Sequence, residues 1–201
     1  MITDEQIVEI YFMADELYKA YLQTMSHYAI TDQTKKKRRH YHRASRMSPS
    51  EIMTILILFH FSGQRCLKHF YTSYVCVHMK DMFRNLVSYN RFVELERTVA
   101  IPLYVFIKMK LLGHCTGISF VDSTPLRVCK NQRILIHKTF AGYAARGKCS
   151  MGWFYGFKLH LIINDCGEII NFAISPGDVD DRKPLHNPKF VEKITGKLCG
   201  D

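Results

Sequence analysis

Hydrophobic residues recur at helical spacing through the first part of the chain. Near the N-terminus they fall every three or four positions, at Ile7, Ile10, Ala14, Leu17 and Tyr21. Such a stripe is typical of a helix that buries one face against a core. Thr3 and Gln6 stand three residues apart at its start, which is the spacing of a capping box. The pattern therefore predicts a core-facing helix that begins just after Thr3.

A second helix is predicted by a capping signal followed by an apolar run. Ser48 can cap this helix, Pro49 suits its first turn, and Glu51 completes a capping box. The apolar run spans residues 52–61, and Gly63 can end the helix in a left-handed conformation. We expect this helix to be largely buried.

The residues after Gly63 predict further helices. Residues 64–74 carry Arg65 and Lys68 near their start, so helix, glycine turn and second helix resemble a helix-turn-helix. Many helical pairs share this pattern, and both interpretations stay open: a DNA-binding motif, or two helices packed on a core. A longer helix is predicted for residues 88–112, bent or interrupted at Pro102.

The pattern changes at about residue 115, where short strands replace long helices. Residues 156–163 alternate between apolar and polar side chains, and a turn at 164–167 leads into another strand, which makes a hairpin. The predicted order is strand 118–121, strand 156–163, strand 168–175, helix 180–194 and strand 197–200. We therefore expect a helical region over residues 1–114 and an α/β region over residues 115–201.

Composition and charge indicate what kind of partner the protein binds. The 201 residues are 47% hydrophobic, enough for a sizeable core, and their formal net charge is +10. Such an excess indicates a polyanionic partner, either nucleic acid or an anionic membrane surface. The apolar run 52–61 is far shorter than the about 20 residues that a membrane-spanning helix needs. The seven cysteines show no C-x-x-C spacing, and the N-terminus is acidic, so we expect a cytoplasmic, nucleoid-associated protein without a membrane partner.

The positive charge is concentrated in two acid-free segments. The first, an arm over residues 35–46, holds Lys35, Lys36, Lys37, Arg38, Arg39, Arg43 and Arg46. A run of like charge repels itself inside a fold, so we expect an exposed arm that contacts DNA phosphates. The alternative is an ordinary solvated surface, which is what most such runs are.

The second basic segment spans residues 126–153 and has no predicted helix or strand. It holds Arg127, Lys130, Arg133, Lys138, Arg146 and Lys148. A structureless segment of this length inside a compact domain is usually functional. We expect Arg127, Arg133, Arg146 and Lys148 to contact DNA, together with Lys158 in the strand that follows.

Two aspartates stand at strand ends. Asp122 follows strand 118–121, and Asp201 follows strand 197–200. If the first strand lies centrally and the last pairs beside it in parallel, the two carboxylates come close together. Neighbouring carboxylates repel unless a cation neutralises them, and Mg²⁺ suits a site of one or two carboxylates plus substrate phosphates. Either aspartate taken alone is explained as well by a turn or a helix cap.

Longer segments around these residues resemble a known family. They are Phe120-Val121-Asp122-Ser123-Thr124-Pro125-Leu126, Arg146-Gly147-Lys148, Met151-Gly152-Trp153-Phe154-Tyr155-Gly156-Phe157-Lys158-Leu159-His160 and Pro176-Gly177-Asp178-Val179-Asp180-Asp181-Arg182. Upstream, Val87-Ser88-Tyr89-Asn90-Arg91-Phe92-Val93-Glu94-Leu95 is similar too. The sequence resembles bacterial insertion-sequence transposases with a DDE core, and within them the group called insertion sequence nine-eight-two.

The resemblance implies a ribonuclease-H-like mixed sheet in which three carboxylates hold two Mg²⁺ or Mn²⁺ ions. The first carboxylate falls on Asp122 and the second on Asp201. The third, a glutamate on a later helix, has no counterpart in the sequence, so we expect the sheet to be truncated and the 201-residue chain to be inactive or nearly so. Asp181 is a competing second carboxylate, but its position at a predicted helix start favours a capping role. The family's usual residue at position 178 is asparagine, from which Asp178 departs.

The leading hypothesis is a DNA transposase that cleaves and joins DNA strands at the ends of an insertion sequence. Its partners would be double-stranded DNA, both element ends and target, and further copies of itself in an oligomer on DNA. Two alternatives stay open: a DNA-binding protein without catalysis, and a ribonuclease-H-like nuclease of another kind, which would cut without joining.

Overall fold

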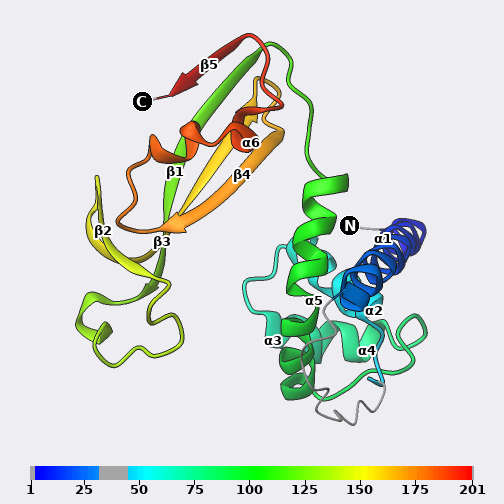
Figure 1. Ribbon diagram of the computed structural model, residues 1–201. Coiled ribbons are helices and arrows are strands. Elements are labelled where there is room, and N and C mark those ends of the chain that lie inside the picture. Colours follow the sequence, from blue (N-terminus) through cyan, green and yellow to red (C-terminus); the bar gives the residue numbers. More distant parts are fainter. Residues whose placement is uncertain (1–2, 32–44, 201) are drawn as a thin grey trace. The chain divides into compact units, whose positions relative to one another are not determined.

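The computed structural model describes residues 3–31 and 45–200 (Figure 1). The chain divides into two compact units, Met1–Met109 and Lys110–Asp201. The first unit is built from helices. They are α1 (Asp4–Thr31), α2 (Pro49–Phe61), α3 (Leu67–His69), the π-helical turn η1 (Phe70–Val75), α4 (Cys76–His78) and α5 (Tyr89–Lys110).

Local capping signals set where the first two long helices begin. At α1, Thr3 Oγ1 accepts from the Gln6 N–H at 3.3 Å, and Gln6 Oε1 accepts from the Thr3 N–H at 3.0 Å. At α2, Ser48 and Glu51 exchange the same pair of bonds, at 3.1 and 2.6 Å. Both predicted capping boxes are confirmed. They satisfy backbone N–H groups that a helix N-terminus otherwise leaves without partners.

The core of the first unit forms around α2, which is buried along most of its length. In α1, Ile7, Ala14 and Leu17 from the predicted stripe are buried and pack in the same core. The Ser50 hydroxyl donates to Asp15 Oδ1 at 2.8 Å and ties α2 to α1. After α2, Gly63 adopts the left-handed φ of 68° expected of a residue that ends a helix.

The second unit is a mixed five-stranded sheet with short helical turns. Its strands are β1 (Ile118–Cys129), β2 (Ala145–Cys149), β3 (Gly152–Asn164), β4 (Ile169–Pro176) and β5 (Lys197–Gly200). The order is β2-β3-β1-β5, and β4 also pairs with β3. Strand β1 is antiparallel to β3 and parallel to β5. Helices followed by this mixed sheet confirm the predicted fold class and are consistent with the ribonuclease-H-like expectation.

The two faces of the sheet differ. Side chains alternate between faces along a strand. Val121 and Ile162, which are cross-strand partners, pack with Ile170 and with Phe190 of α6 (Pro188–Val191), so this face is covered. On the opposite face Phe120 is 44% exposed. We call these the covered face and the open face; in Figure 1 the segment with α6 lies over the covered face.

The structure corrects two predicted strand features. Strand β1 has 12 residues rather than four, and its Ile118 and Phe120 are each 44% exposed. The segment 126–153 is not structureless: it contains the end of β1, the 3₁₀ turn η2 (Asn131–Arg133) and strand β2. β2 pairs with the first residues of β3, so β3 begins at Gly152 rather than at residue 156.

The helix predicted for residues 180–194 is also wrong. Only the 3₁₀ turn η3 (Lys183–His186) and the four-residue α6 form there. Pro184 and Pro188 explain the difference, since a proline inside a helix removes a backbone N–H and clashes with the preceding turn. Asn187 caps α6 by accepting from the Lys189 N–H at 3.1 Å, which begins a new helical turn at Pro188.

Candidate functional site

Asp122 lies on the open face of the sheet. Its cross-strand partner on β3 is Leu161, and its side chain is exposed. The Ser123 backbone N–H donates to Asp122 Oδ1 at 2.7 Å, which fixes one oxygen of the carboxylate. Together with Phe120, Thr124 and neighbouring residues, Asp122 lines a shallow hollow of about 180 Å³. A carboxylate beside open space can accept further ligands from outside the protein.

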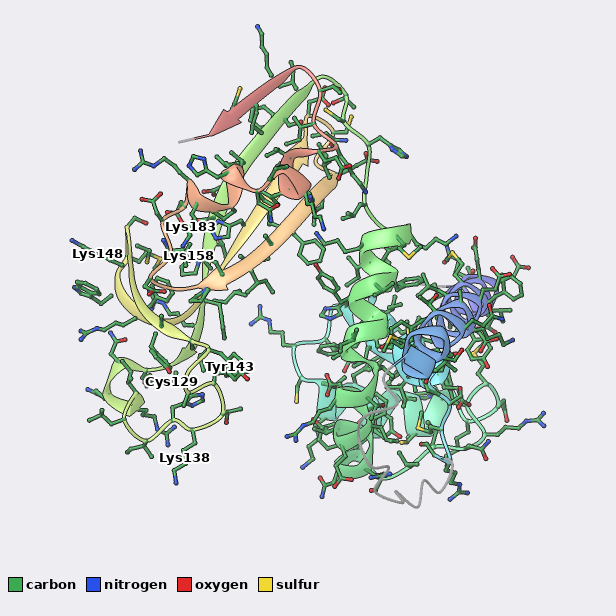
Figure 2. All side chains as sticks on the ribbon, viewed as in Figure 1. Cys129, Lys138, Tyr143, Lys148, Lys158 and Lys183 are labelled. Carbon is green, nitrogen blue, oxygen red and sulfur yellow. The ribbon has the colours of Figure 1, made fainter. Side chains whose placement is uncertain are left out.

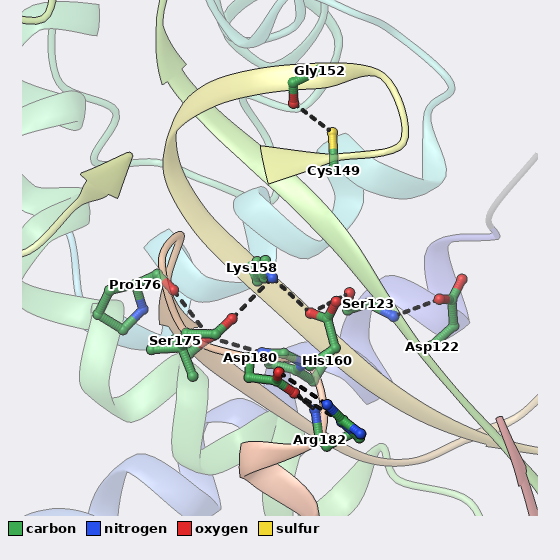
Figure 3. Close-up of polar contacts among 12 residues, drawn as sticks. Asp122, Ser123, Cys149, Gly152, Lys158, His160, Ser175, Pro176, Asp180 and Arg182 are labelled. Atoms are coloured by element: carbon green, nitrogen blue, oxygen red, sulfur yellow. Dashed lines mark hydrogen bonds and ion pairs between the residues drawn. The ribbon is translucent and has the colours of Figure 1, made fainter. Parts of the chain in front are cut away.

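The adjacent residue, Ser123, points to the covered face and joins a polar network (Figure 3). Its hydroxyl donates to Asp181 Oδ1 at 2.8 Å. The Lys158 ammonium, from β3, forms an ion pair with the same oxygen at 2.9 Å and donates to the Val179 carbonyl at 2.9 Å. The network therefore fastens the segment after β4 to both β1 and β3.

Asp181 is charged within this network. Partial burial would raise the pKa of its carboxyl, but the hydrogen bonds from Lys158 and Ser123 and the positive charge of Lys158 outweigh burial. The pKa of Asp181 consequently lies below its ordinary value. An ionised Asp181 gives Lys158 the counter-charge that a buried ammonium requires.

His160 continues the network along β3 and is 1% exposed. Its Nε2 lies 2.8 Å from the Ser175 hydroxyl oxygen, and that hydroxyl donates to the Pro176 carbonyl at 3.3 Å. Because a hydroxyl has one proton, the His160 ring is the donor to Ser175. Burial lowers the pKa of His160; the charge of Asp181 raises it, that of Lys158 lowers it further, and the net shift is downward.

His160 should make the stability of the sheet unit depend on pH. With its pKa lowered in the fold, the unfolded chain binds more protons as pH falls below about 6.5, so stability falls between pH 7.5 and 5.5. One such group contributes at most about 1.4 kcal/mol per pH unit. We expect His160→Gln to flatten this dependence, as measured by urea unfolding followed by the fluorescence of Trp153, the single tryptophan. An equally steep dependence in the variant would assign the effect to another group.

Asp181 does not play the predicted capping role. The 3₁₀ turn that follows begins at Lys183, and the Asp181 carboxylate binds side chains of two strands. Asp180, not Asp181, accepts from the following backbone, at 2.9 Å from the Arg182 N–H. Since Asp181 contacts Ser123, it approaches the covered face, opposite to the face that carries Asp122. That placement argues against Asp181 as a shared metal ligand with Asp122.

The described residues offer one carboxylate, that of Asp122, that is suited to a hard divalent cation. Among the described residues, no group of three or more His, Cys, Asp or Glu side chains is placed to hold a metal ion. Mg²⁺ needs only one or two protein carboxylates when phosphates and waters complete its shell. Asp122, exposed and held at one oxygen, fits such a ligand. Asp201 lies outside the described residues.

The predicted DNA-contacting residues fall into three groups. Lys35, Lys36, Lys37, Arg38, Arg39 and Arg43 lie outside the described residues, whereas Arg46, just before α2, is exposed. Arg127, Arg133, Arg146 and Lys148 are exposed on the β1–β3 segment, where a phosphate could reach them. Figure 2 shows Lys148 on β2 and Lys138 at the far end of the loop before it.

Lys158 departs from the prediction. Its side chain is 9% exposed, and its ammonium is already bound to Asp181 and Val179. A lysine in this environment holds the fold together and does not present its charge to DNA. The signal for this was in the strand pattern: Lys158 and His160 share a face with the buried Ile162, so their polar groups needed partners inside the protein.

No helix among the described residues is long and apolar enough to cross a membrane.

Comparison with known proteins gives one result. No curated protein and no solved structure matches the chain. Residues 112–201, however, match the family described as Transposase DDE domain. The match contains β1 with Asp122 and the whole polar network of the covered face. The C-terminal part of the chain is thus similar to a transposase DDE domain.

Proposed function

We propose that the protein is a DNA transposase that cuts and joins DNA strands at the ends of an insertion sequence, with Asp122 and Asp201 as two of its metal-binding carboxylates. The observation that supports this proposal most directly is the parallel pairing of β5 with β1, in which Val121 is paired with Gly200. Paired residues of parallel strands share a face. Continuing this register by one residue would bring Asp201 beside Asp122 on the open face.

In this proposal Asp122, Asp201 and the DNA phosphates would hold two Mg²⁺ or Mn²⁺ ions. When bound, the ions supply an activated hydroxyl nucleophile and stabilise the leaving oxygen of the phosphodiester. The chain itself orients Asp122 through the Ser123 N–H and keeps Ser123 in place through Asp181. Arg127, Arg133, Arg146 and Lys148 would bind phosphates of the DNA on either side of the cleaved bond.

The finer assignments belong to the same proposal. The motif resemblance supports the insertion sequence nine-eight-two group, and a helical region over residues 1–114 that binds DNA through its basic arm. Activity at two ends of one element would require at least two copies of the protein on the DNA, which supports a homo-oligomer. Action on chromosomal DNA would place the protein at the nucleoid.

The test uses protein expressed from its complete reading frame, together with a labelled duplex that contains the DNA flanking that frame and a supercoiled target plasmid. We expect labelled DNA to be cleaved and joined to the plasmid when Mg²⁺ is present. Cleaved products with no joined product would favour a nuclease, and a gel shift without cleavage would favour a non-catalytic DNA-binding protein.

A further inference from the structure

The segment between β1 and β3 exposes large apolar side chains among its cations. Between residues 126 and 153, the exposed fractions are 99% for Leu135, 75% for Ile136, 73% for Tyr143, 80% for Met151 and 53% for Trp153. The same segment carries six Lys and Arg residues and no Asp or Glu. We call residues 126–153 the basic–apolar segment.

Binding to duplex phosphates does not explain these apolar side chains. Phosphate contacts are made by cations and need no apolar surface. Apolar groups left in water carry a free-energy cost, and clusters of them usually mark an interaction site. The natural partner of this segment is therefore both anionic and able to cover apolar side chains.

Unpaired DNA has both properties. Its backbone is anionic, and its bases, no longer stacked in a duplex, offer apolar faces to aromatic and aliphatic side chains. In a duplex those faces are hidden between neighbouring base pairs. We propose that the basic–apolar segment binds unpaired nucleotides at the cleaved or melted end of the element. This proposal rests on the proposed function and adds the form of the DNA substrate to it.

Trp153 is held as a platform for stacking. The Arg146 guanidinium carbon lies 5.1 Å from the centre of the Trp153 ring, which places a cation against the indole. Asn131 Nδ2 donates to the Trp153 carbonyl at 3.0 Å and links the turn η2 to the start of β3. A base that stacks here would have a cation close to its phosphate.

Leu135 and Ile136 form an apolar tip beside a basic hollow. The tip follows η2, with Arg133 on one side in sequence and Lys138 on the other. Ile136 and Arg133 also line a hollow of about 610 Å³ that includes Lys130 and His137. Apolar side chains of this kind can pack against the exposed faces of unpaired bases. In Figure 2 the loop that carries Lys138 extends away from the sheet.

The test measures the affinity of three labelled DNAs of equal length: a duplex, a duplex with an unpaired 3′ tail, and a single strand. Fluorescence anisotropy at fixed salt, without divalent metal, keeps catalysis out of the measurement. The unchanged protein should bind tailed or single-stranded DNA at least about tenfold more tightly than duplex. The double variant Leu135→Ser with Ile136→Ser should lose most of this preference while its affinity for duplex stays within about twofold.

Two matched variants complete the design. Ile101→Ser changes an apolar residue in α5 that is also largely exposed (65%) and should leave the preference intact. Arg133→Gln should weaken binding to all three DNAs and reduce the salt dependence of duplex binding by about one unit of slope. Circular dichroism checks that each variant is folded. Because the substitutions are on the surface, each variant should give the spectrum of the unchanged protein.

Equal weakening of duplex and single-strand binding by the double variant would overturn the proposal. A second result would also overturn it: the unchanged protein self-associates, and the double variant abolishes that self-association without altering the preference among the three DNAs. Leu135 and Ile136 would then contact a second copy of the chain and not DNA. The proposed function fails separately, through cleavage that survives Asp122→Asn, and that result leaves the affinity measurement interpretable.

Discussion

Asp122→Asn should abolish metal-dependent cleavage and joining by the protein expressed from its complete reading frame. Asparagine has almost the same shape and can still accept the Ser123 N–H at its oxygen. It lacks the negative charge and one of the two strong acceptor oxygens that a divalent cation requires. Loss of the several kcal/mol that a metal ion contributes to the transition state corresponds to a rate reduction of at least about a thousandfold.

The control for this variant is Asp178→Asn. It removes the same charge from an exposed position of the same unit, on the segment that follows β4. Asp178→Asn should therefore retain the rate, and both variants should bind duplex DNA as the unchanged protein does. Cleavage by Asp122→Asn within about tenfold of the unchanged rate would remove Asp122 from the catalytic centre.

Asp181→Ala should destabilise the sheet unit more than Lys158→Met does. Removing the carboxylate leaves a 9% exposed ammonium that is still hydrogen-bonded to the Val179 carbonyl but has lost its counter-charge, at a cost of about 2 kcal/mol. Removing the ammonium leaves Asp181, whose side chain is 56% exposed, hydrated and still bonded to Ser123. Methionine fills the space of the lysine stem, so the second change should cost less than about 1 kcal/mol.

The measurement is urea unfolding followed by Trp153 fluorescence, which reports on β3. The double variant Lys158→Met with Asp181→Ala should recover most of the stability that Asp181→Ala loses. Asp178→Ala, at an exposed position after β4, is a control for removal of a carboxylate outside the network. Equal losses from the two single variants would mean that the ion pair acts through its attraction alone and not through burial of the ammonium.

Features governed by neighbouring residues could be predicted from the sequence. The capping boxes of α1 and α2 depend on residues three positions apart, and the β3–β4 hairpin depends on the turn at Gly167, whose φ is 82°. These two signals act over short stretches of chain, so tertiary packing had little to override. The parallel pairing of β5 with β1 entered the sequence analysis only as a condition for bringing Asp122 and Asp201 together, and the structure shows that pairing.

Features governed by distant contacts were missed. Strand β1 continues to Cys129 because β3 supplies hydrogen-bonding partners as far as Tyr155. Lys158 was assigned to DNA on charge alone, yet its partner Asp181 lies 23 positions away and reaches it only because the segment after β4 folds back. The failed helix over 180–194 is different, since Pro184 and Pro188 were visible in the sequence and were given too little weight.

The central claim is that Asp122 holds a divalent cation on the open face of the sheet. The most direct test is X-ray diffraction from crystals of the protein soaked in Mn²⁺, with anomalous maps that locate the metal. We expect a manganese peak about 2.2 Å from an Asp122 carboxylate oxygen, with Asp201 as a second ligand, and no peak at Asp181. A peak at Asp181 that leaves Asp122 without metal would contradict the account.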